Sequence, residues 1–567
     1  MHRTQTLWRL AAALAFMLSM AAAGAAPAAT PPAQNSRADA QAFIDESTAK
    51  YNAGLQSSSK RGQTIVPAAG PVWTADLDTW VEYTFPASSG ASCMNGTPYR
   101  MYYRIASEAS MRDKVLIDFE GGGACWDFDS CKPDAKLGAS NPDGLPSGYL
   151  QGNGIATTTT LNLTSPVLDG NTPLVNAAAA FFFKRGTGTL EDRSWWNFLK
   201  LTSRPETQRW TQLVFPYCTG DVNSGASFRV FEDPSNSQNS KKVNFNGLNN
   251  VRAAMEFLRK NKFAESLSSR KSIQQLLVYG ASAGGYSTLA NYPMIREALA
   301  GGKTRVAMFS DSGTLLPAPV YKAGEEILAS DLDKTPAVKF WQKVTHAWGW
   351  FQQPTVADAQ TPGHPEYAEQ AKGLVARWEK ATGEKLELLK SRGGDTGNLN
   401  RLLSKRYAED RFGLSTFQQD QIISSFAFAG GQNAEVVGLT GSAFREAKMK
   451  LFTKELDLVR AELGPLPNYG YYMPWSRYVI VGSHVTTALT FAGTDIWRPA
   501  NLRDDGGRVA PEFYGDVGFF LNNLISTQSL ASLPVLKEVG APGEAFNPAN
   551  IVGTILSWFK FWDAPAA

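Results

Sequence analysis

Short apolar runs alternate with segments of helical spacing through the middle of the chain. The runs at 114–120, 211–216, 273–279 and 305–309 are rich in Val, Leu, Ile and Phe, which is typical of strands buried on both faces of a sheet. Between the second and third runs, the apolar residues of 246–261 recur every three or four positions, as they do on one face of a helix. This alternation predicts an α/β fold, with a mostly parallel sheet covered by helices on both faces.

The same kinds of pattern continue on either side of this region. Residues 41–60 have a polar, helical pattern, and residues 98–105 and 411–417 are strand-like. Residues 441–464 predict an amphipathic helix, and a last strand is expected at 478–481. The sheet is therefore expected to extend through most of the chain.

Residues 322–407 differ in character from the rest. Charged helical segments there carry many aromatic residues and are broken by stretches rich in Pro and Gly. We expect a helical insertion that forms a cap over the functional edge of the sheet. A separate binding domain is the alternative interpretation.

The composition excludes some classes of binding partner. The chain has 567 residues, of which 43% are hydrophobic and 19% charged, as expected for a large globular protein. Its formal net charge is only +3, and no basic run is interleaved with aromatic residues, so we expect no nucleic-acid partner. No stretch reaches the ~20 apolar residues that a membrane span needs. We expect a monomer.

The N-terminus has the features of an export signal. Arg3 and Arg9 precede an apolar stretch, which is followed by small residues with an Ala-x-Ala pattern near Ala23 and Ala25. This pattern predicts a signal peptide at 1–25, and residues 26–60 are then a linker and N-terminal segment. The mature protein is expected in the periplasm or outside the cell.

Four cysteines fit an oxidising compartment. Cys125 and Cys131 are close in sequence, which leaves Cys93 and Cys218 as the other pair. A metal site is the competing interpretation, but no Cys-x-x-Cys or His–Cys spacing supports it. We therefore expect disulfides and no metal.

The strongest chemical motif follows the strand at 273–279. Gly280-Ala-Ser-Ala-Gly284 lies between this strand and a helix-compatible segment, which is the context of a nucleophile elbow. Such a turn exposes the Ser282 hydroxyl at the end of the sheet and places the Ala283 N–H beside it. A glycine-rich turn without chemistry is the alternative interpretation, and a hydrolase is favoured by the context.

A glycine run, Gly121 to Gly123, directly follows the strand at 114–120. It lacks the Gly-Lys-Ser/Thr ending of a phosphate-binding loop and the spaced glycines of a dinucleotide fingerprint. In a hydrolase, a glycine-rich loop in this place supplies further N–H groups to an oxyanion hole. We therefore expect Gly122, Gly123 and Ala283 to be the oxyanion donors.

A serine nucleophile needs a base, and the chain has four histidines. His2 is in the signal peptide, His346 is on an aromatic segment of the insertion, and His364 is in its Gly- and Pro-rich loop. His484 follows the last predicted strand, so its position matches the Ser…Asp…His order of the α/β-hydrolase class. We expect His484 to be the base.

The acid should orient the imidazole and stabilise its protonated form. Asp420 follows the strand at 411–417 and lies between Ser282 and His484 in the chain. Asp311, at the end of the strand at 305–309, is the rival. Asp410 precedes its strand and is discounted. We expect Asp420 to be the acid.

Several short blocks resemble the pectin acetylesterase/Notum family of secreted α/β-hydrolase carboxylesterases. They occur in the family's order between about 92 and 317, and they read Leu116-Ile-Asp-Phe-Glu-Gly-Gly-Gly-Ala-Cys125, Phe215-Pro-Tyr-Cys-Thr-Gly-Asp-Val-Asn-Ser-Gly-Ala226, Gly280-Ala-Ser-Ala-Gly-Gly285 and Ser310-Asp-Ser-Gly313. The resemblance implies Ser282 as nucleophile, Gly122, Gly123 and Ala283 as oxyanion donors, and Cys93–Cys218 and Cys125–Cys131 as disulfides. Where the family usually has a Trp in its glycine loop, this chain reads Gly123-Ala124.

Taken together, these features predict an exported serine carboxylesterase. Residues 61–567 would form an α/β-hydrolase-like catalytic domain, with 322–407 as its cap. Its substrate would carry small acyl groups, acetyl in particular, on a hydroxyl-bearing molecule such as a polysaccharide, and no cofactor is implied. A lipid or polyester esterase with an aromatic cap is the second hypothesis, and an inactive secreted binding protein is the third.

Overall fold

The computed structural model describes most of the chain between residues 35 and 539. The described ranges are 35–57, 73–149 without 76, 134, 136–137 and 147–148, then 206–316, 336–386, 396–428, 439–476, 483–489, 502–506, 517–526 and 532–539. The expected signal peptide at 1–25 and the expected strand at 478–481 lie outside these ranges. Within them, no helix is long and apolar enough to cross a membrane.

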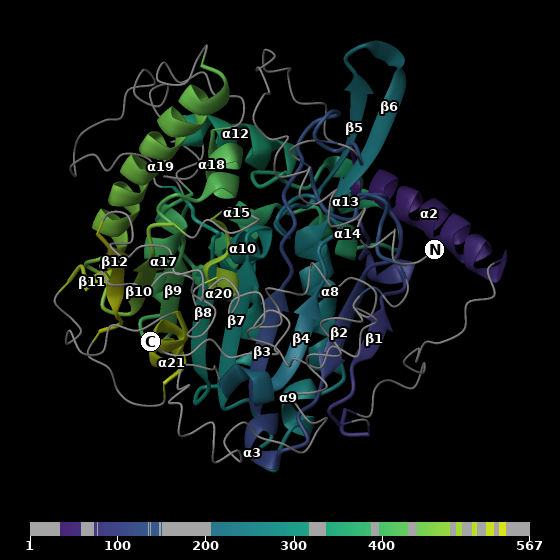
Figure 1. Ribbon diagram of the computed structural model, residues 1–567. Coiled ribbons are helices and arrows are strands. Elements are labelled where there is room, and N and C mark those ends of the chain that lie inside the picture. The colour runs from purple at the N-terminus through teal and green to yellow at the C-terminus, as the bar shows by residue number, and fades with distance from the viewer. Residues whose placement is uncertain are drawn as a thin grey trace, which may run out of the picture.

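Within the described ranges, ten strands form one twisted sheet in the order β1-β2-β4-β3-β7-β8-β9-β10-β12-β11 (Figure 1). The strands from β4 to β12 in this order pair in parallel, whereas β1, β2 and β11 pair antiparallel at the two edges. In chain order the strands are β1 (Val81–Thr84), β2 (Arg100–Arg104), β3 (Lys114–Phe119), β4 (Thr211–Phe215), β7 (Gln275–Ala281), β8 (Arg305–Asp311), β9 (Arg411–Ser415), β10 (Tyr469–Met473), β11 (Leu502–Asp504) and β12 (Val535–Glu538). The mostly parallel α/β fold expected from the sequence is confirmed.

Helices cover both faces of the sheet. The longer ones are α2 (Arg37–Ser57), α8 (Gly247–Lys260), α10 (Ala283–Leu299), α12 (Pro336–Ala347), α15 (Leu374–Thr382), α17 (Asn398–Arg406), α18 (Gln421–Ala427), α19 (Gly441–Leu463) and α21 (Val517–Ile525). Short helical turns are η2 (Ala87–Ser89), α3 (Ala109–Arg112), η4 (Glu206–Arg209), α9 (Phe263–Ser266), α13 (Val356–Gln360), α14 (Glu366–Gln370) and α20 (Thr486–Leu489).

Alternate residues of the central strands point to opposite faces, as the period of a strand requires. In β3, Val115 and Ile117 join a large cluster that includes the apolar faces of α8 and α10. Leu116, between them, joins a second cluster with Leu521 and Leu524 of α21. The near-continuous apolar runs of these strands therefore reflect burial on both faces.

The described residues of the segment at 322–407, the predicted insertion, form helices and share a core with the sheet. Its tryptophans are buried, and their indole N–H groups donate to the main fold: Trp348 to the carbonyl of Cys125 at 2.8 Å, and Trp378 to the carbonyl of Ala290 in α10 at 2.7 Å. The large cluster contains these residues together with the strand residues. These two tryptophans therefore attach the segment to the loop after β3 and to α10.

Several strands were not anticipated from the sequence, among them β10. A hairpin of β5 (Ser227–Asp233) and β6 (Asn236–Phe245) projects from one end of the molecule (Figure 1). Strands β11 and β12 lie after residue 481, so the prediction that the last strand is at 478–481 was wrong. Strands β11 and β12 are only three and four residues long, and β6 is mostly polar, which leaves little periodic signal.

Candidate active site

Ser282 lies in a tight turn between β7 and α10. Its backbone has φ 57° and ψ −122°, a conformation that costs a non-glycine residue free energy and is concentrated at functional sites. A Cβ atom at Gly280 would lie 2.2 Å from the carbonyl oxygen of Gly284, and one at Gly284 would lie 2.0 Å from that of Phe119. Only glycine allows these approaches, which explains both glycines of the motif.

The Ser282 turn is fixed to the neighbouring strand. The backbone N–H of Ser282 donates to the carbonyl oxygen of Asp311, the last residue of β8, at 2.7 Å. Because β8 is the immediate parallel neighbour of β7, both ends lie at the carboxyl edge of the sheet. Open α/β sheets build their sites at this edge.

The glycine loop after β3 lies directly against this turn. A Cβ atom at Gly121 would lie 2.4 Å from the carbonyl oxygen of Ala281 and 3.0 Å from Cβ of Ser282. Within the described ranges, no backbone carbonyl accepts a hydrogen bond from the N–H of Gly122, Gly123 or Ala283. Ala283 is the first residue of α10, where helix N–H groups have no partner within the helix. These amides can therefore serve as donors to a bound oxygen.

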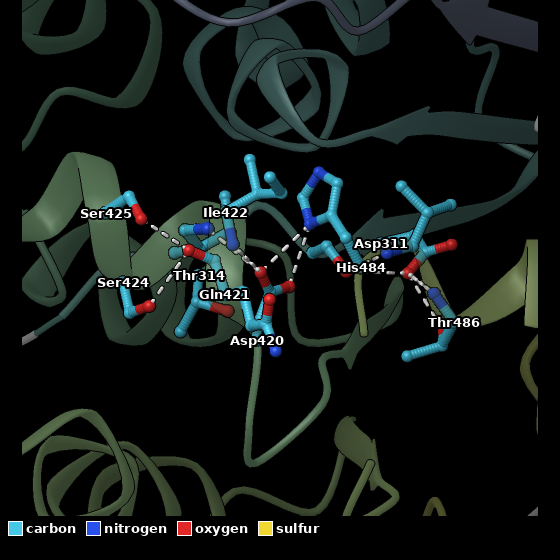
Figure 2. A network of polar contacts seen from close by, with 12 residues as sticks. Asp311, Thr314, Asp420, Gln421, Ile422, Ser424, Ser425, His484 and Thr486 are labelled. Carbon is cyan, nitrogen blue, oxygen red and sulfur yellow. Dashed lines mark hydrogen bonds and ion pairs between the residues drawn. The ribbon is translucent and has the colours of Figure 1, made fainter. Parts of the chain in front are cut away.

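His484 and Asp420 face each other (Figure 2). The Nδ1 atom of His484 lies 3.0 Å from Oδ1 and 2.9 Å from Oδ2 of Asp420. The Asp420 side chain is fully buried, whereas that of His484 is 15% exposed. Figure 2 shows the second ring nitrogen of His484 pointing away from Asp420, so Nε2 is the atom that can face a substrate or nucleophile.

Asp420 is also the N-cap of α18. Its Oδ1 accepts hydrogen bonds from the N–H groups of Ile422 and Ile423 at 3.0 and 2.9 Å. These bonds fix the carboxylate in the orientation that His484 meets, because a cap is bound to the rigid start of its helix. Asp420 also lies near α10, since its charge adds to burial in raising the pKa of Tyr286.

The rival acid, Asp311, has different partners. Its buried carboxylate accepts bonds from Thr486, Thr487 and Ser415. The other aspartate, Asp410, binds the Tyr292 hydroxyl at 2.8 Å at the amino end of β9. Of these three aspartates, Asp420 is the one for which the structure records contact with His484.

The other two histidines of the described ranges lie in different surroundings. The carbonyl oxygen of His346 in α12 accepts a bond from Arg229, and burial, with a smaller effect from Arg229, lowers the pKa of its imidazole. The exposed His364 lies 3.0 Å from Glu366 and stacks on Tyr367. Within the described ranges, the structure records a side-chain contact with Ser282 for none of the three histidines, and His484 differs from the other two by its contact with Asp420.

Both cysteine pairs form disulfides. Cys93 bonds Cys218, 125 positions away, and Cys125 bonds Cys131, six positions away, with Cα separations of 5.0 and 4.9 Å. Cys125 comes just after the glycine loop, and its N–H donates to the carbonyl of Gly220 at 2.8 Å. The disulfides therefore brace the loops that follow β3 and β4. In the part of the chain that is described, no cluster of His, Cys, Asp or Glu is placed to hold a metal.

Glu120 was not singled out from the sequence. It links β3 to the glycine loop, and its carboxyl accepts the Tyr149 hydroxyl at 2.7 Å and the N–H of Tyr217 at 2.9 Å. Burial raises the pKa of Glu120 to about 7, against the smaller effect of these two hydrogen bonds. Its only sequence signal is its place directly before the glycines.

Aromatic residues surround the same groups. A Cβ atom at Gly123 would lie 3.3 Å from Cζ of Phe426 in α18, and the Phe426 ring lies edge-on to Trp126. Tyr286, one turn after Ser282 in α10, lies with its ring centroid 5.0 Å from that of Trp341 in α12. The insertion thus contributes to the surroundings of the Ser282 turn through Trp341.

Comparison with known proteins gives one family. The family described as "PAE: Pectinacetylesterase" matches residues 199–337, which include the Ser282 turn and the end of β8. No curated protein matches the chain. Two solved structures of the Wnt deacylase Notum from Drosophila are similar at 15% identity. For the first, the TM-score is 0.40, and the match covers 80% of this chain and 95% of the Notum chain. For the second, the TM-score is 0.34, and the match covers 69% of this chain and 83% of the Notum chain.

The family match includes three of the four sequence blocks that suggested the resemblance, at 215–226, 280–285 and 310–313, whereas the block at 116–125 precedes it. The matched residues include β4, β7 and β8 of the mostly parallel sheet, and the resemblance implied an α/β fold of this kind. Residues 199–337 of this chain are therefore similar to the pectinacetylesterase family.

Proposed function

We propose that this protein is an exported serine esterase that removes small acyl groups, acetyl in particular, from a hydroxyl-bearing substrate such as a polysaccharide. The observation that carries the proposal is the contact of His484 Nδ1 with both oxygens of Asp420. This pair comes from loops after parallel strands of the sheet that also carries Ser282 and the glycine loop. An ester hydrolase is the activity named by the family.

In the proposed reaction, Nε2 of His484 takes the proton of the Ser282 hydroxyl as its oxygen attacks the ester carbonyl. Asp420 holds the imidazole by Nδ1 and stabilises its protonated form. The carbonyl oxygen becomes an oxyanion that the N–H groups of Gly122, Gly123 and Ala283 can bind. The C–O bond then breaks, and the alcohol leaves with the proton from His484.

The second half of the reaction repeats these steps with water. His484 takes a proton from water, whose oxygen attacks the acyl carbon of the ester on Ser282. The acid product forms, and the Ser282 oxygen regains the proton from His484. Losing a single oxyanion donor costs comparable enzymes about 2.7–4 kcal/mol of barrier, so the glycine loop matters as much as the base.

The preference for a small acyl group is supported by the aromatic surroundings. Phe426 lies beside Gly123, and Tyr286 follows Ser282 by one helical turn with its hydroxyl bound to the carbonyl of Thr314 at 2.8 Å. Large rings held in place leave less room than aliphatic side chains for a long acyl chain. The second candidate function, a lipid or polyester esterase, would instead require a long acyl chain to bind along these rings.

Export is supported by the disulfides. Two of them are formed, and disulfides persist in the periplasm and outside the cell but are rare in the cytosol. The pattern of residues 1–25 supports the same proposal.

A fluorophosphonate probe tests the proposal directly, because it reacts with activated serine hydroxyls. We expect the purified mature protein to be labelled, Ser282→Ala to lose labelling, and the control Ser424→Ala in α18 to keep it. Circular dichroism should show all three folded. Labelling that survives Ser282→Ala contradicts the assignment, and an unlabelled wild type favours the inactive binding protein.

A substrate panel then separates the two enzymatic candidates. We expect faster hydrolysis of p-nitrophenyl acetate than of its long-chain analogues, and release of acetate from acetylated pectin or xylan. Preference for long-chain esters or for a polyhydroxyalkanoate film supports the second candidate instead.

A further inference from the structure

Asp311 is a buried carboxylate with an unusually full set of donors. Its Oδ1 accepts the N–H and the hydroxyl of Thr486, both at 2.9 Å, and the hydroxyl of Ser415 at 2.9 Å. Its Oδ2 accepts the N–H and the hydroxyl of Thr487 at 2.9 and 2.6 Å. The residue has no solvent exposure. Each of these bonds is stronger than a neutral one because the acceptor is a carboxylate.

These donors belong to the segment that carries His484. Thr486 and Thr487 are the second and third residues after the histidine, and they begin α20. The neighbour of Asp311 adds one more bond, since the hydroxyl of Ser312 accepts the N–H of Val485 at 3.0 Å. The end of β8 thus holds three consecutive backbone N–H groups of the histidine segment.

The backbone of Asp311 holds the other reacting residue. Its carbonyl oxygen accepts the N–H of Ser282 at 2.7 Å, while the Asp311 side chain binds the residues after His484. Figure 2 shows Asp311 reaching Thr486 while His484 turns its ring towards Asp420. One residue is therefore bonded both to the nucleophile turn and to the histidine segment.

We propose that Asp311 is a positioning residue of the catalytic site, which fixes the distance and orientation of His484 relative to Ser282. This inference rests on the proposed function and adds a second carboxylate to it, with a task distinct from that of Asp420. A misplacement of about 1 Å between reacting groups can cost roughly 100-fold in rate. The Asp311 carboxylate limits such movement because its acceptor bonds reach two successive residues of one segment.

Two linked hydroxyl hydrogen bonds connect Asp311 to Tyr279 in β7. The Tyr279 hydroxyl lies 2.9 Å from the Thr487 hydroxyl, which itself donates to Asp311. Since the Thr487 hydroxyl has one proton, and this proton goes to the carboxylate, Tyr279 is the donor of the other bond. The burial of Tyr279 raises its pKa, with a further effect from the charge of Asp311, so its hydroxyl keeps the proton that this bond needs.

The test uses Asp311→Asn, which keeps the shape of the side chain. Its amide nitrogen must face either the donors of Thr486 or those of Thr487, so at least two donors lose their acceptor. We expect kcat per active site for p-nitrophenyl acetate to fall about 10- to 100-fold with KM changed less than about threefold, as positioning predicts. Active sites are counted by complete labelling with the fluorophosphonate, which removes the contribution of unfolded protein.

Asp410→Asn is the matched control. Asp410 is also a buried aspartate with a tyrosine partner, but it precedes β9 at the opposite edge of the sheet. We expect it to lower the melting temperature while leaving kcat per labelled site near that of the wild type. A second pair, Thr487→Val and Thr487→Ser, keeps the test valid if Asp311→Asn fails to fold. The valine variant should lose turnover per site, and the serine variant should regain most of it.

The inference is overturned if kcat per labelled site of Asp311→Asn equals that of the wild type. If Asp311→Asn does not fold, the same result for Thr487→Val overturns it. Loss of activity explained wholly by fewer labelled sites also overturns it, because the role is then structural only. The outcome is distinct from failure of the proposed function, in which the wild type itself is not labelled at Ser282.

Discussion

Both carboxylate oxygens of Asp420 lie within hydrogen-bond distance of Nδ1 of His484, at 3.0 and 2.9 Å, although 64 positions separate the two residues. The same carboxylate caps α18 through two backbone N–H groups. One side chain therefore combines a helix cap with the orientation of an imidazole. The two tasks can be separated by mutation, because asparagine is also a good N-cap.

We predict that Asp420→Asn lowers kcat by on the order of 10³- to 10⁴-fold with little loss of stability. An amide can cap α18, but it stabilises neither the correct tautomer nor the protonated form of His484. Asp420→Ala should lose similar activity and also about 1 kcal/mol of stability, because the cap is removed. Turnover per labelled site and urea unfolding measure the two effects. Activity near that of the wild type in Asp420→Asn contradicts the assignment.

We predict that Gly121→Ala impairs catalysis more than binding. Its Cβ would lie 2.4 Å from the carbonyl oxygen of Ala281, so the glycine loop must move away from the Ser282 turn. Displaced oxyanion donors should lower kcat by roughly 100- to 1,000-fold. Gly302→Ala is the control, since nothing lies within 4 Å of its added Cβ. Equal kcat values for the two variants would show that the glycine loop does not contribute to catalysis.

The two disulfides should differ in their contributions to stability. Cys93–Cys218 closes a loop with a sequence separation of 125, and Cys125–Cys131 one of six. In the chain-entropy account, the long loop contributes about 4–5 kcal/mol and the short one roughly 2 kcal/mol. We therefore expect the double serine variant of Cys93 and Cys218 to lose more stability in urea unfolding.

The shorter disulfide should matter more for activity than its stability effect suggests. Cys125 lies two residues beyond Gly123 and is held to Gly220 through its N–H. Replacing Cys125 and Cys131 by serine should release the end of the glycine loop and lower kcat per labelled site. Unchanged turnover in this variant, with normal labelling, would show that the glycine loop is held by its other contacts alone.

Glu120 should make stability depend on pH. Burial raises its pKa from the ordinary 4.5 to about 7, so the folded protein holds this proton more tightly than the unfolded chain does. The resulting stability is fully present below pH 4.5 and is lost as the pH rises through about 7. The difference corresponds to roughly 3 kcal/mol as an upper limit.

The variant Glu120→Gln isolates this contribution, since Gln does not titrate. We expect the free energy of unfolding of the wild type, measured against the variant, to decrease between pH 4.5 and pH 8. Asp221, whose pKa burial raises to about 6, is present in both proteins and cancels in the difference. A difference that is constant with pH would show that Glu120 keeps an ordinary pKa in the folded protein.

The sequence by itself determined the class of fold and the strand–turn–helix context of Ser282. Continuous apolar runs separated by a helical pattern are a local consequence of strands buried on both faces, and they can be read without knowing which strands pair. The turn at Ser282 is also local, because its glycines avoid clashes that arise within a few residues or with the adjacent strand. The elements expected at 114–120, 211–216, 246–261, 305–309 and 441–464 agree with β3, β4, α8, β8 and α19.

Only the tertiary structure decided which aspartate meets His484. Asp311 and Asp420 both follow parallel strands, and these strands, β8 and β9, are neighbours, so their carboxyl ends lie at the same edge. Strand position therefore could not separate them. The choice depends on the packing of residues 483–487, in which Thr486 and Thr487 bind Asp311 and leave the ring of His484 facing Asp420. Contacts of this kind join segments far apart in the chain and have no periodic signal in the sequence.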